Sequence, residues 1–416
     1  MTTLGGSSRV VGVDLARGVA LLGIMAVHIF PPLQADGSVH PAFLIDSGRS
    51  PALFPLLAGV GVALANGGDR LPAGVQLWSA RAGLAARAFL LIAVGLLLGR
   101  VDSPPLVILV HFGFMFLAAT LFLSLRTRAL LVIAAVWVVV VPTVSFLVRT
   151  GPAGTAGSPQ LPGPSSILQP FVDLALTSAY PVLVWTAYLL VGLAIGRSGM
   201  AASRRPVQLV MVGTAVSVVG KVSSSLLLGA AGGARSLTGH TEGLRVFAPD
   251  METQLGVGLV GTTPTTDWRW LLVSAAHSST TFDLLHTGGA AVAVLGVCLL
   301  VVRWVGRTGV LPLVAVGSMT LTLYSAHVLA LWRDGPLLLE DPFLLYVAHG
   351  AVAIVVALLW RSYVGRGPLE AFAAGLDATA RAGVSRRSRR SGAPASATRT
   401  SRGRSSRDTR KRTSGT

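Results

Sequence analysis

The sequence predicts an all-α integral membrane protein with about ten transmembrane helices and a disordered basic C-terminal tail. Hydrophobic residues make up 52% of its 416 residues and charged residues only 12%, with a mean hydropathy of +0.68. Soluble domains carry about 25% charged residues, so this composition excludes an ordinary soluble enzyme. Apolar runs also recur along the chain at the length of roughly 20 residues that crosses about 30 Å of hydrocarbon.

Ten apolar runs predict the transmembrane helices. They form a membrane domain over residues 1–365, with outer loops at about 150–175 and 231–280. The first loop is rich in Gly, Pro and Ser, and the second contains Trp268 and Trp270, whose indole rings suit the headgroup level of a membrane. The expected spans are 10–31, 50–66, 80–99, 105–125, 129–148, 177–196, 206–229, 281–302, 308–331 and 342–363.

The distribution of Lys and Arg predicts which side of the membrane each loop occupies. Cytoplasmic loops carry an excess of these residues, and ten spans with both termini cytoplasmic place the basic loops together on that side. We therefore expect a multi-pass protein of the plasma membrane. The basic loops contain Arg70, Arg81, Arg87, Arg126, Arg128, Arg197, Arg204, Arg205, Arg303 and Arg307.

Most of the net charge of +17 lies in segment 366–416, which has thirteen Lys and Arg and three acidic residues. We predict that this segment is a disordered cytoplasmic tail, because its end has almost no apolar residues. Such a tail would be attracted to anionic membrane lipid. RNA binding is the alternative, although we expect no specific nucleic-acid partner. Cys298 is the only cysteine, so no intrachain disulfide can form.

The first apolar run, from Arg9 to Pro32, contains three ionisable residues, Asp14, Arg17 and His28. On a helix, Arg17 lies about 60° from Asp14 and about 20° from His28, and about 16 Å from His28 along the axis. Ionisable groups in membrane helices usually face the protein interior or a water-filled cavity. The spacing therefore predicts one inward stripe with a cation at one level and an imidazole at the other.

Histidine is the usual general base near neutral pH, and none of the eight histidines falls in a predicted cytoplasmic loop or in the tail. His28 is the first candidate, and His111, His286 and His327 are further candidates. Asp283 precedes His286 by three residues and could orient its ring, as in other catalytic carboxylate–imidazole pairs. A helix cap explains Asp283 equally well. No metal site is predicted.

Arg17 suits a phosphorylated ligand, because a guanidinium binds phosphate through two parallel hydrogen bonds. Pairing with Asp14 at i, i+3 is the structural alternative. The two interpretations are compatible, because Asp14 could orient Arg17. A phosphate site at one level and a base at the other describe a long phosphorylated donor that passes between the helices.

Four segments resemble a known family. DLARGVALLGIMAVH, with Arg17 and His28, resembles the Arg-to-His motif in the first helix of the large membrane acyltransferase superfamily, and in particular bacterial relatives of heparan-alpha-glucosaminide N-acetyltransferase. GRSPALFPLLAGVGVAL (Gly48–Leu64) resembles the second helix of these relatives. LPLVAVGSMTLTLYSAHVL (Leu311–Leu329) and GRGPLEAF (Gly365–Phe372) resemble their YeiB-like bacterial branch.

This resemblance implies an acyl transfer across the membrane. Acetyl-CoA or another acyl-CoA would be the cytoplasmic co-substrate, with no permanently bound cofactor. The acceptor at the outer face would be a sugar, a cell-envelope polysaccharide or a lipid headgroup. The implied site contains His28 as the catalytic base and Arg17 at the phosphates of the donor. We also assign Asp14 to the catalytic group, because it could orient Arg17. Direct transfer and an acyl-histidine intermediate both remain open.

Two other classes of protein fit parts of the sequence. A transporter or lipid flippase would also have a polar cavity, but it would favour internal repeats and broken helices near the midplane. No convincing repeat is present, and the polar residues lie at two levels. A membrane scaffold with a basic tail would leave the stripe of Arg17 and His28 unexplained. We therefore favour the acyltransferase.

Overall fold

The structure is a computed structural model that describes residues 10–101, 103–149, 158, 168–199, 204–334 and 340–391. The described residues are helical throughout, apart from loops and one isolated bridge between Leu33 and Val39. The α-helices are α1 (Val11–Ile29), α2 (Pro41–Asp46), α3 (Arg49–Ala65), α4 (Gly74–Leu98), α5 (Leu109–Phe122), α6 (Thr127–Val148), α7 (Leu168–Val172), α8 (Val182–Arg197), α9 (Arg205–Ala230), α10 (Met251–Val257), α11 (Thr281–Gly309), α12 (Leu311–Gly317), α13 (Thr320–Asp334), α15 (Pro342–Tyr363) and α16 (Pro368–Ser391).

Seven helices are long and apolar enough to cross a membrane, or nine if each of two bent helix pairs is one span. The predicted span 177–196 corresponds to a pair bent by 52° that ends in α8, and the predicted span 308–331 corresponds to α12 and α13, bent by 80°. The predicted span 105–125 is α5, whose 14 residues reach only about 21 Å. The expected total of about ten spans is therefore not confirmed.

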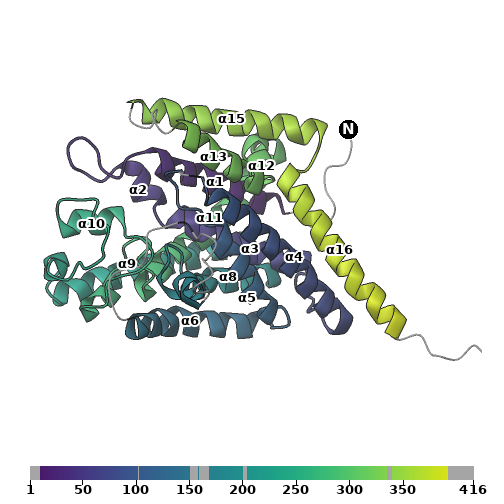
Figure 1. Cartoon of the computed structure of the whole chain (residues 1–416), viewed down its shortest axis with the longest axis horizontal. Helices are drawn as coiled ribbons and strands as arrows, with labels where there is room; N and C mark the ends of the chain where they lie inside the picture. Colours follow the sequence, from purple (N-terminus) through teal and green to yellow (C-terminus); the bar gives the residue numbers. More distant parts are fainter. Residues whose placement is uncertain are drawn as a thin grey trace, which may run out of the picture.

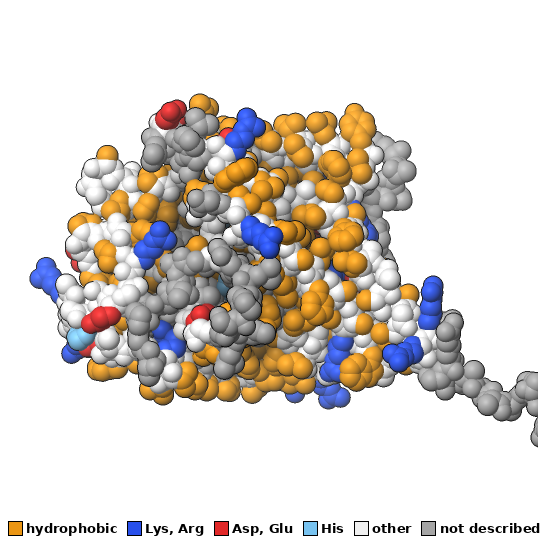
Figure 2. Space-filling view, viewed as in Figure 1, with side chains coloured by type: hydrophobic (Ala, Val, Ile, Leu, Met, Phe, Trp, Pro, Cys, Tyr) orange, Lys and Arg blue, Asp and Glu red, His pale blue; other side chains and the backbone are white. Residues whose placement is uncertain are grey.

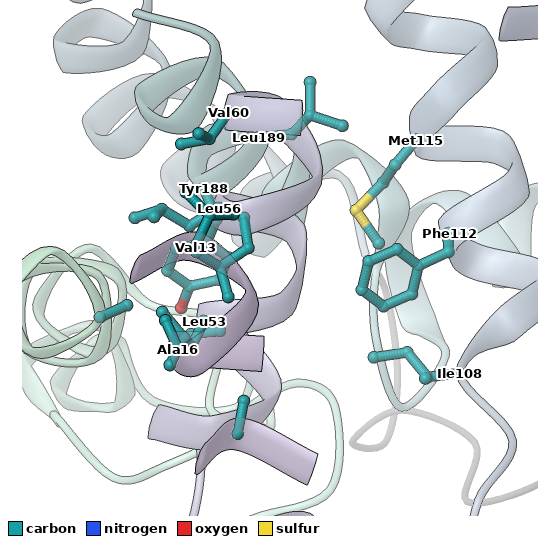
Figure 3. Close-up of a cluster of buried hydrophobic side chains, with 14 of the residues drawn as sticks. Val13, Ala16, Leu53, Leu56, Val60, Ile108, Phe112, Met115, Tyr188 and Leu189 are labelled. Atoms are coloured by element: carbon teal, nitrogen blue, oxygen red, sulfur yellow. The ribbon is translucent and has the colours of Figure 1, made fainter. Parts of the chain in front are cut away.

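The central core lies where α1, α3 and α8 meet, with α5 beside them (Figure 3). Val13, Leu56, Val60 and Leu189 are all at most 3% exposed. Helix α3 approaches α8 so closely at Gly59 that a Cβ there would overlap the carbonyl oxygen of Leu189. The small residues of this helix thus serve close helix packing.

The peripheral helices expose apolar side chains in the way that lipid-facing helices do. Figure 2 shows hydrophobic side chains spread over much of one face of the molecule. Only 22% of the most apolar window of α6 is buried, against 72% for α1. Large exposed apolar residues of α6 include Val132, Val136, Val139 and Leu147. This arrangement agrees with a membrane protein whose first helix lies inside the bundle.

The predicted disordered tail at 366–416 is wrong for its first part. Residues Pro368–Ser391 form α16, which runs diagonally along α4 in Figure 1. Asp377 and Arg381 form an ion pair at 3.0 Å, and Arg381 also donates to the side chain of Asn66 at 2.9 Å. The strongly basic end dominated the composition of the whole segment and hid this alanine-rich helical part. Residues 392–416 lie outside the described residues.

The second predicted outer loop, 231–280, folds onto the helices. Its short helices enclose a small apolar cluster in which Trp270 is 0% exposed, with the indole Nε1 donating to the carbonyl of His240 at 2.9 Å. Trp268 is 59% exposed, so only this indole suits the headgroup level. Most of the first predicted loop, 150–175, lies outside the described residues.

Candidate functional site

A cavity of about 680 Å³ lies against the first half of α1. Asp14 and Arg17 line it, and they form an ion pair at 3.2 Å. Asp14 is 2% exposed, whereas the side chain of Arg17 retains 28% exposure. The predicted pairing at i, i+3 is therefore present, and the carboxylate fixes the guanidinium at the wall of an open cavity.

Two further arginines, Arg87 of α4 and Arg366 before α16, line the same cavity. Arg87 lies within electrostatic reach of both Arg17 and Arg366. Its Nε lies 3.4 Å from the carboxylate of Asp377. The carboxylate of Glu370 accepts hydrogen bonds from the backbone of Leu321 and Thr322, and so it is already engaged. The cavity thus gathers three guanidinium groups, an arrangement that favours a ligand with several negative charges.

A second cavity, of about 400 Å³, lies against the other end of α1 and contains His28. Ile24, Ile108 and Tyr324 line both cavities, so the two adjoin at these side chains. We call these three side chains the neck. Within it, the hydroxyl of Tyr324 accepts a hydrogen bond from the backbone N–H of Ile108 at 3.4 Å. The stripe predicted on the first helix therefore lines two adjoining cavities, with Asp14 and Arg17 at the first and His28 at the second.

His28 is hydrogen-bonded to other histidines. Its Nδ1 lies 3.3 Å from Nε2 of His327, and Nδ1 of His327 lies 2.8 Å from Nδ1 of His349. Nε2 of His349 lies 3.8 Å from the carboxylate of Asp334. The rings of His28 and His327 are stacked at 5.5 Å between centroids. The structure thus brings together His28 and His327, which were separate candidates in the sequence.

His277 is a second imidazole at the wall of the second cavity. Its ring stacks on Trp185 with the centroids 5.8 Å apart, and its backbone has a φ of 59°, in the left-handed region that few side chains adopt. Burial lowers the pKa of His277 to about 4, so the ring is neutral near pH 7. Backbone strain of this kind often occurs at functional sites.

The remaining sequence candidates lie elsewhere. His111 is 0% exposed, is bonded to Ser178 and lines neither cavity. His286 bonds to Arg49 and Ser217 instead of to Asp283. The carboxylate of Asp283 accepts from the backbone N–H of Ser279 at the start of α11, which agrees with the helix-cap interpretation. Within the described part of the chain, no group of three or more His, Cys, Asp or Glu is placed to hold a metal ion.

Sequence reasoning did not select Arg87, Arg366, His277 and His349 as site residues. Arg87 and Arg366 were counted only as charges that set topology and tail. His277 lies in a predicted outer loop. The only sequence feature that could have selected it is the predicted gathering of the histidines on the outer side of the membrane. His349 lies in a late span, and its partners are distant in sequence, so no local pattern identifies it.

These features define a multi-pass helical membrane protein in which a cavity lined by three arginines adjoins a cavity lined by His28 and His277. Residues 9–228, just over half of the chain, match the family described as heparan-alpha-glucosaminide N-acetyltransferase, catalytic. The chain belongs to this family, which indicates an acetyltransferase-like membrane enzyme. Among curated proteins, none matches the chain significantly.

Proposed function

We propose that the protein transfers an acyl group, most simply acetyl, from acyl-CoA to an acceptor of the cell envelope. The observation that carries this proposal is the pair of adjoining cavities, one with three arginines and the other with His28. Both volumes lie in the range of about 300–1,000 Å³ that is usual for ligand sites. The family match favours this enzyme over the transporter or flippase.

The donor would bind with its phosphates at Arg17, Arg87 and Arg366. CoA carries several negative charges, which three guanidinium groups can accept as charge-assisted hydrogen bonds. The uncharged pantetheine arm would pass Ile24, Ile108 and Tyr324 and bring the thioester toward His28. The distance to cover is about 16 Å along α1.

His28 would act on the acceptor in the second cavity. A hydroxyl or amine attacks a thioester poorly unless a base takes its proton as the bond forms, and such a base contributes typically about 10²–10⁴-fold. The matched family is named for an amino sugar, so a glucosamine residue of a glycan is the first acceptor to test. We propose that this cavity opens to the outside and that the arginine-lined cavity opens to the cytoplasm.

The function is tested with purified protein in detergent or nanodiscs. Radiolabelled acetyl-CoA is incubated with glucosamine, with cell-envelope polysaccharide and with envelope lipid, and labelled product is separated from donor. Transfer to one of these fractions supports the proposal. Tight acetyl-CoA binding without transfer to any fraction would oppose it, as would uptake of an unmodified solute by proteoliposomes.

The orientation is tested separately. A reporter that is active only outside the membrane, fused after Thr416, should stay silent if the arginine-lined cavity faces the cytoplasm together with α16. A strong signal from this fusion would reverse the direction of the proposed transfer.

A further inference from the structure

Two imidazoles and one carboxylate follow His28 in a chain of contacts that ends at Asp334, the last residue of α13. The contacts run from His28 to His327 at 3.3 Å, from His327 to His349 at 2.8 Å, and from His349 to Asp334 at 3.8 Å. We call these four residues the histidine relay. They come from α1, α13 and α15, and only His28 lies within the matched residues 9–228.

The negative charge of Asp334, 3.8 Å from Nε2 of His349, favours a proton on that nitrogen, and the two shorter contacts then set the protons of the other rings. A neutral imidazole has one N–H donor and one acceptor nitrogen, and an ionised carboxylate only accepts. If Nε2–H of His349 points to Asp334, Nδ1 of His349 must accept from Nδ1–H of His327. Nε2 of His327 must then accept from Nδ1–H of His28, which leaves Nε2 of His28 without a proton.

The unprotonated Nε2 of His28 is available to a ligand. Nε2 of His28 has no hydrogen-bond partner within the described part of the chain, and His28 lines the second cavity. His277, Tyr324 and Arg245 line the same cavity, and Arg333 lies 3.9 Å from Asp334 at the other end of the relay. These are the titratable and charged neighbours that the contacts of the relay include.

An apolar cluster lies on the same three helices as the relay. Ile29, Leu331 and Leu345 form one cluster and are 3%, 0% and 6% exposed. Ile29 follows His28 directly, and the two leucines lie one helical turn from His327 and His349. His327 itself is only 3% exposed, and a hydrogen bond in such a buried environment is stronger than in water.

We propose that His327, His349 and Asp334 are positioning residues. They hold His28 in the tautomer with an unprotonated Nε2, and they share the proton that His28 gains. The proposal rests on the proposed function, in which His28 is the base. A carboxylate that orients an imidazole and stabilises its cation is an established device. Here the device acts through two intermediate rings.

The proton movements balance within the relay. The acceptor's O–H or N–H bond breaks and its proton forms an N–H bond at Nε2 of His28. The Nδ1 proton of His28 passes to Nε2 of His327, and the Nδ1 proton of His327 passes to Nδ1 of His349. The positive charge then lies beside Asp334. When the C–S bond of the thioester breaks, the thiolate takes the proton from Nε2 of His28, and the reverse shifts restore the starting tautomers.

The first test measures the tautomer of His28 by ¹⁵N-histidine NMR on the full-length protein in nanodiscs at pH 7.5. The resonances are assigned from the His28→Gln variant. We expect the Nδ1–H tautomer in the wild type and a shift toward Nε2–H in Asp334→Ala and His327→Leu. The matched control is Asp267→Ala, which removes the carboxylate of another His–Asp pair, His240–Asp267, at 3.5 Å. This control should leave His28 unchanged.

The Nε2–H tautomer in the wild type would overturn the relay, as would an unchanged His28 in Asp334→Ala. Folding of each variant is checked by its thermal midpoint and its acetyl-CoA affinity. If His327→Leu does not fold, Asp334→Ala decides, because the Asp334 side chain is 30% exposed and packs less tightly.

The second test measures acyl transfer. In Asp334→Ala we expect kcat to fall by about 10- to 100-fold, less than the loss from removing a base outright, with KM for acetyl-CoA unchanged. An unchanged kcat would overturn the role in transfer. If the wild type transfers no acyl group, the proposed function fails, whereas the tautomer measurement still decides whether the relay sets His28.

Discussion

The two ends of α1 line two cavities of different composition, the first with three arginines and the second with two histidines and one arginine, Arg245. At one end, Arg17 is held by Asp14 and joined by Arg87 and Arg366. At the other end, His28 is hydrogen-bonded to His327, and no carboxylate within the described part of the chain contacts it directly. Fixed positive charge suits the binding of an anion, and an imidazole that changes its protonation suits catalysis.

The neck between the cavities separates these two tasks. Ile24, Ile108 and Tyr324 carry no ionised group, so they favour an uncharged linker over a phosphate. The difference between the two ends of α1 indicates that donor binding and acyl transfer can be altered independently. Substitutions at the arginine end should change affinity, and substitutions at the histidine end should change turnover.

The largest effect is expected at the histidine end. His28→Gln removes the base, and we expect the rate of acyl transfer to fall by about 10²–10⁴-fold. Affinity for acetyl-CoA should stay within twofold of the wild type, because the phosphates bind at the other end. Radiolabel transfer and calorimetry measure the two quantities on the same preparation.

The control for this variant is His240→Gln, a histidine that lines neither cavity. Wild-type transfer in His28→Gln would remove His28 from the mechanism and turn attention to His111, His286 or His327. An equal loss of affinity would show that the two ends are not independent.

The second effect is expected at the arginine end. Arg17→Ala removes a charge-assisted contact and should weaken acetyl-CoA binding by about 1.5–3 kcal/mol. Arg17→Lys should recover only part of this loss, because an ammonium lacks the planar fork of a guanidinium. Calorimetry with purified variants measures the change.

A ligand without phosphates sharpens this test. The acetyl thioester of pantetheine should bind to the wild type and to Arg17→Ala with equal affinity. Arg235→Ala, an exposed arginine outside the lining of both cavities, controls for net charge. Unchanged acetyl-CoA affinity in a folded Arg17→Ala protein would leave Arg17 only as the structural partner of Asp14.

The same contrast explains what the sequence could predict. Asp14, Arg17 and His28 share one helix, and helical periodicity alone places them on one stripe. The ion pair of Asp14 and Arg17 is a local i, i+3 contact, so the sequence could predict it. The partners of His28 are 299 and more residues away, and their contact depends on how α1, α13 and α15 pack. No local pattern encodes that packing.

The bends escaped prediction for a similar reason. Hydropathy reports how much apolar sequence is present, and it gave the region of α12 and α13 as one span. The 80° bend occurs at Ser318 and Met319, after Gly317, where a Cβ would overlap the carbonyl oxygen of Asp14. Contact with α1 thus accompanies the break, and this contact is visible only in the folded chain.

A third, smaller effect is expected at the support of the arginine end. Glu370 at the start of α16 accepts hydrogen bonds from the backbone N–H groups of Leu321 and Thr322, at 2.7 and 3.2 Å, and from the Thr322 hydroxyl at 2.6 Å. Glu370→Ala leaves these donors without their acceptor, so we expect a loss of about 1–3 kcal/mol of stability. Thermal unfolding in detergent measures it, with the exposed Glu252→Ala as the control. An unchanged midpoint would mean that α16 is not needed to hold the start of α13.

The smallest effect is a pH dependence at the histidine end. The pKa of His277 falls from 6.5 to about 4 on burial, so protonation favours the unfolded chain. This contribution to stability is fully present above pH 6.5 and is lost as the pH falls from 6.5 toward 4. It should amount to about 1 kcal/mol by pH 5.5. His277→Asn is the matched variant, because asparagine tolerates the left-handed backbone at φ 59° and does not titrate. Thermal unfolding at pH 7.5 and 5.5 should show a smaller shift of the midpoint in His277→Asn than in the wild type. Equal shifts in the two proteins would show that His277 does not carry this dependence.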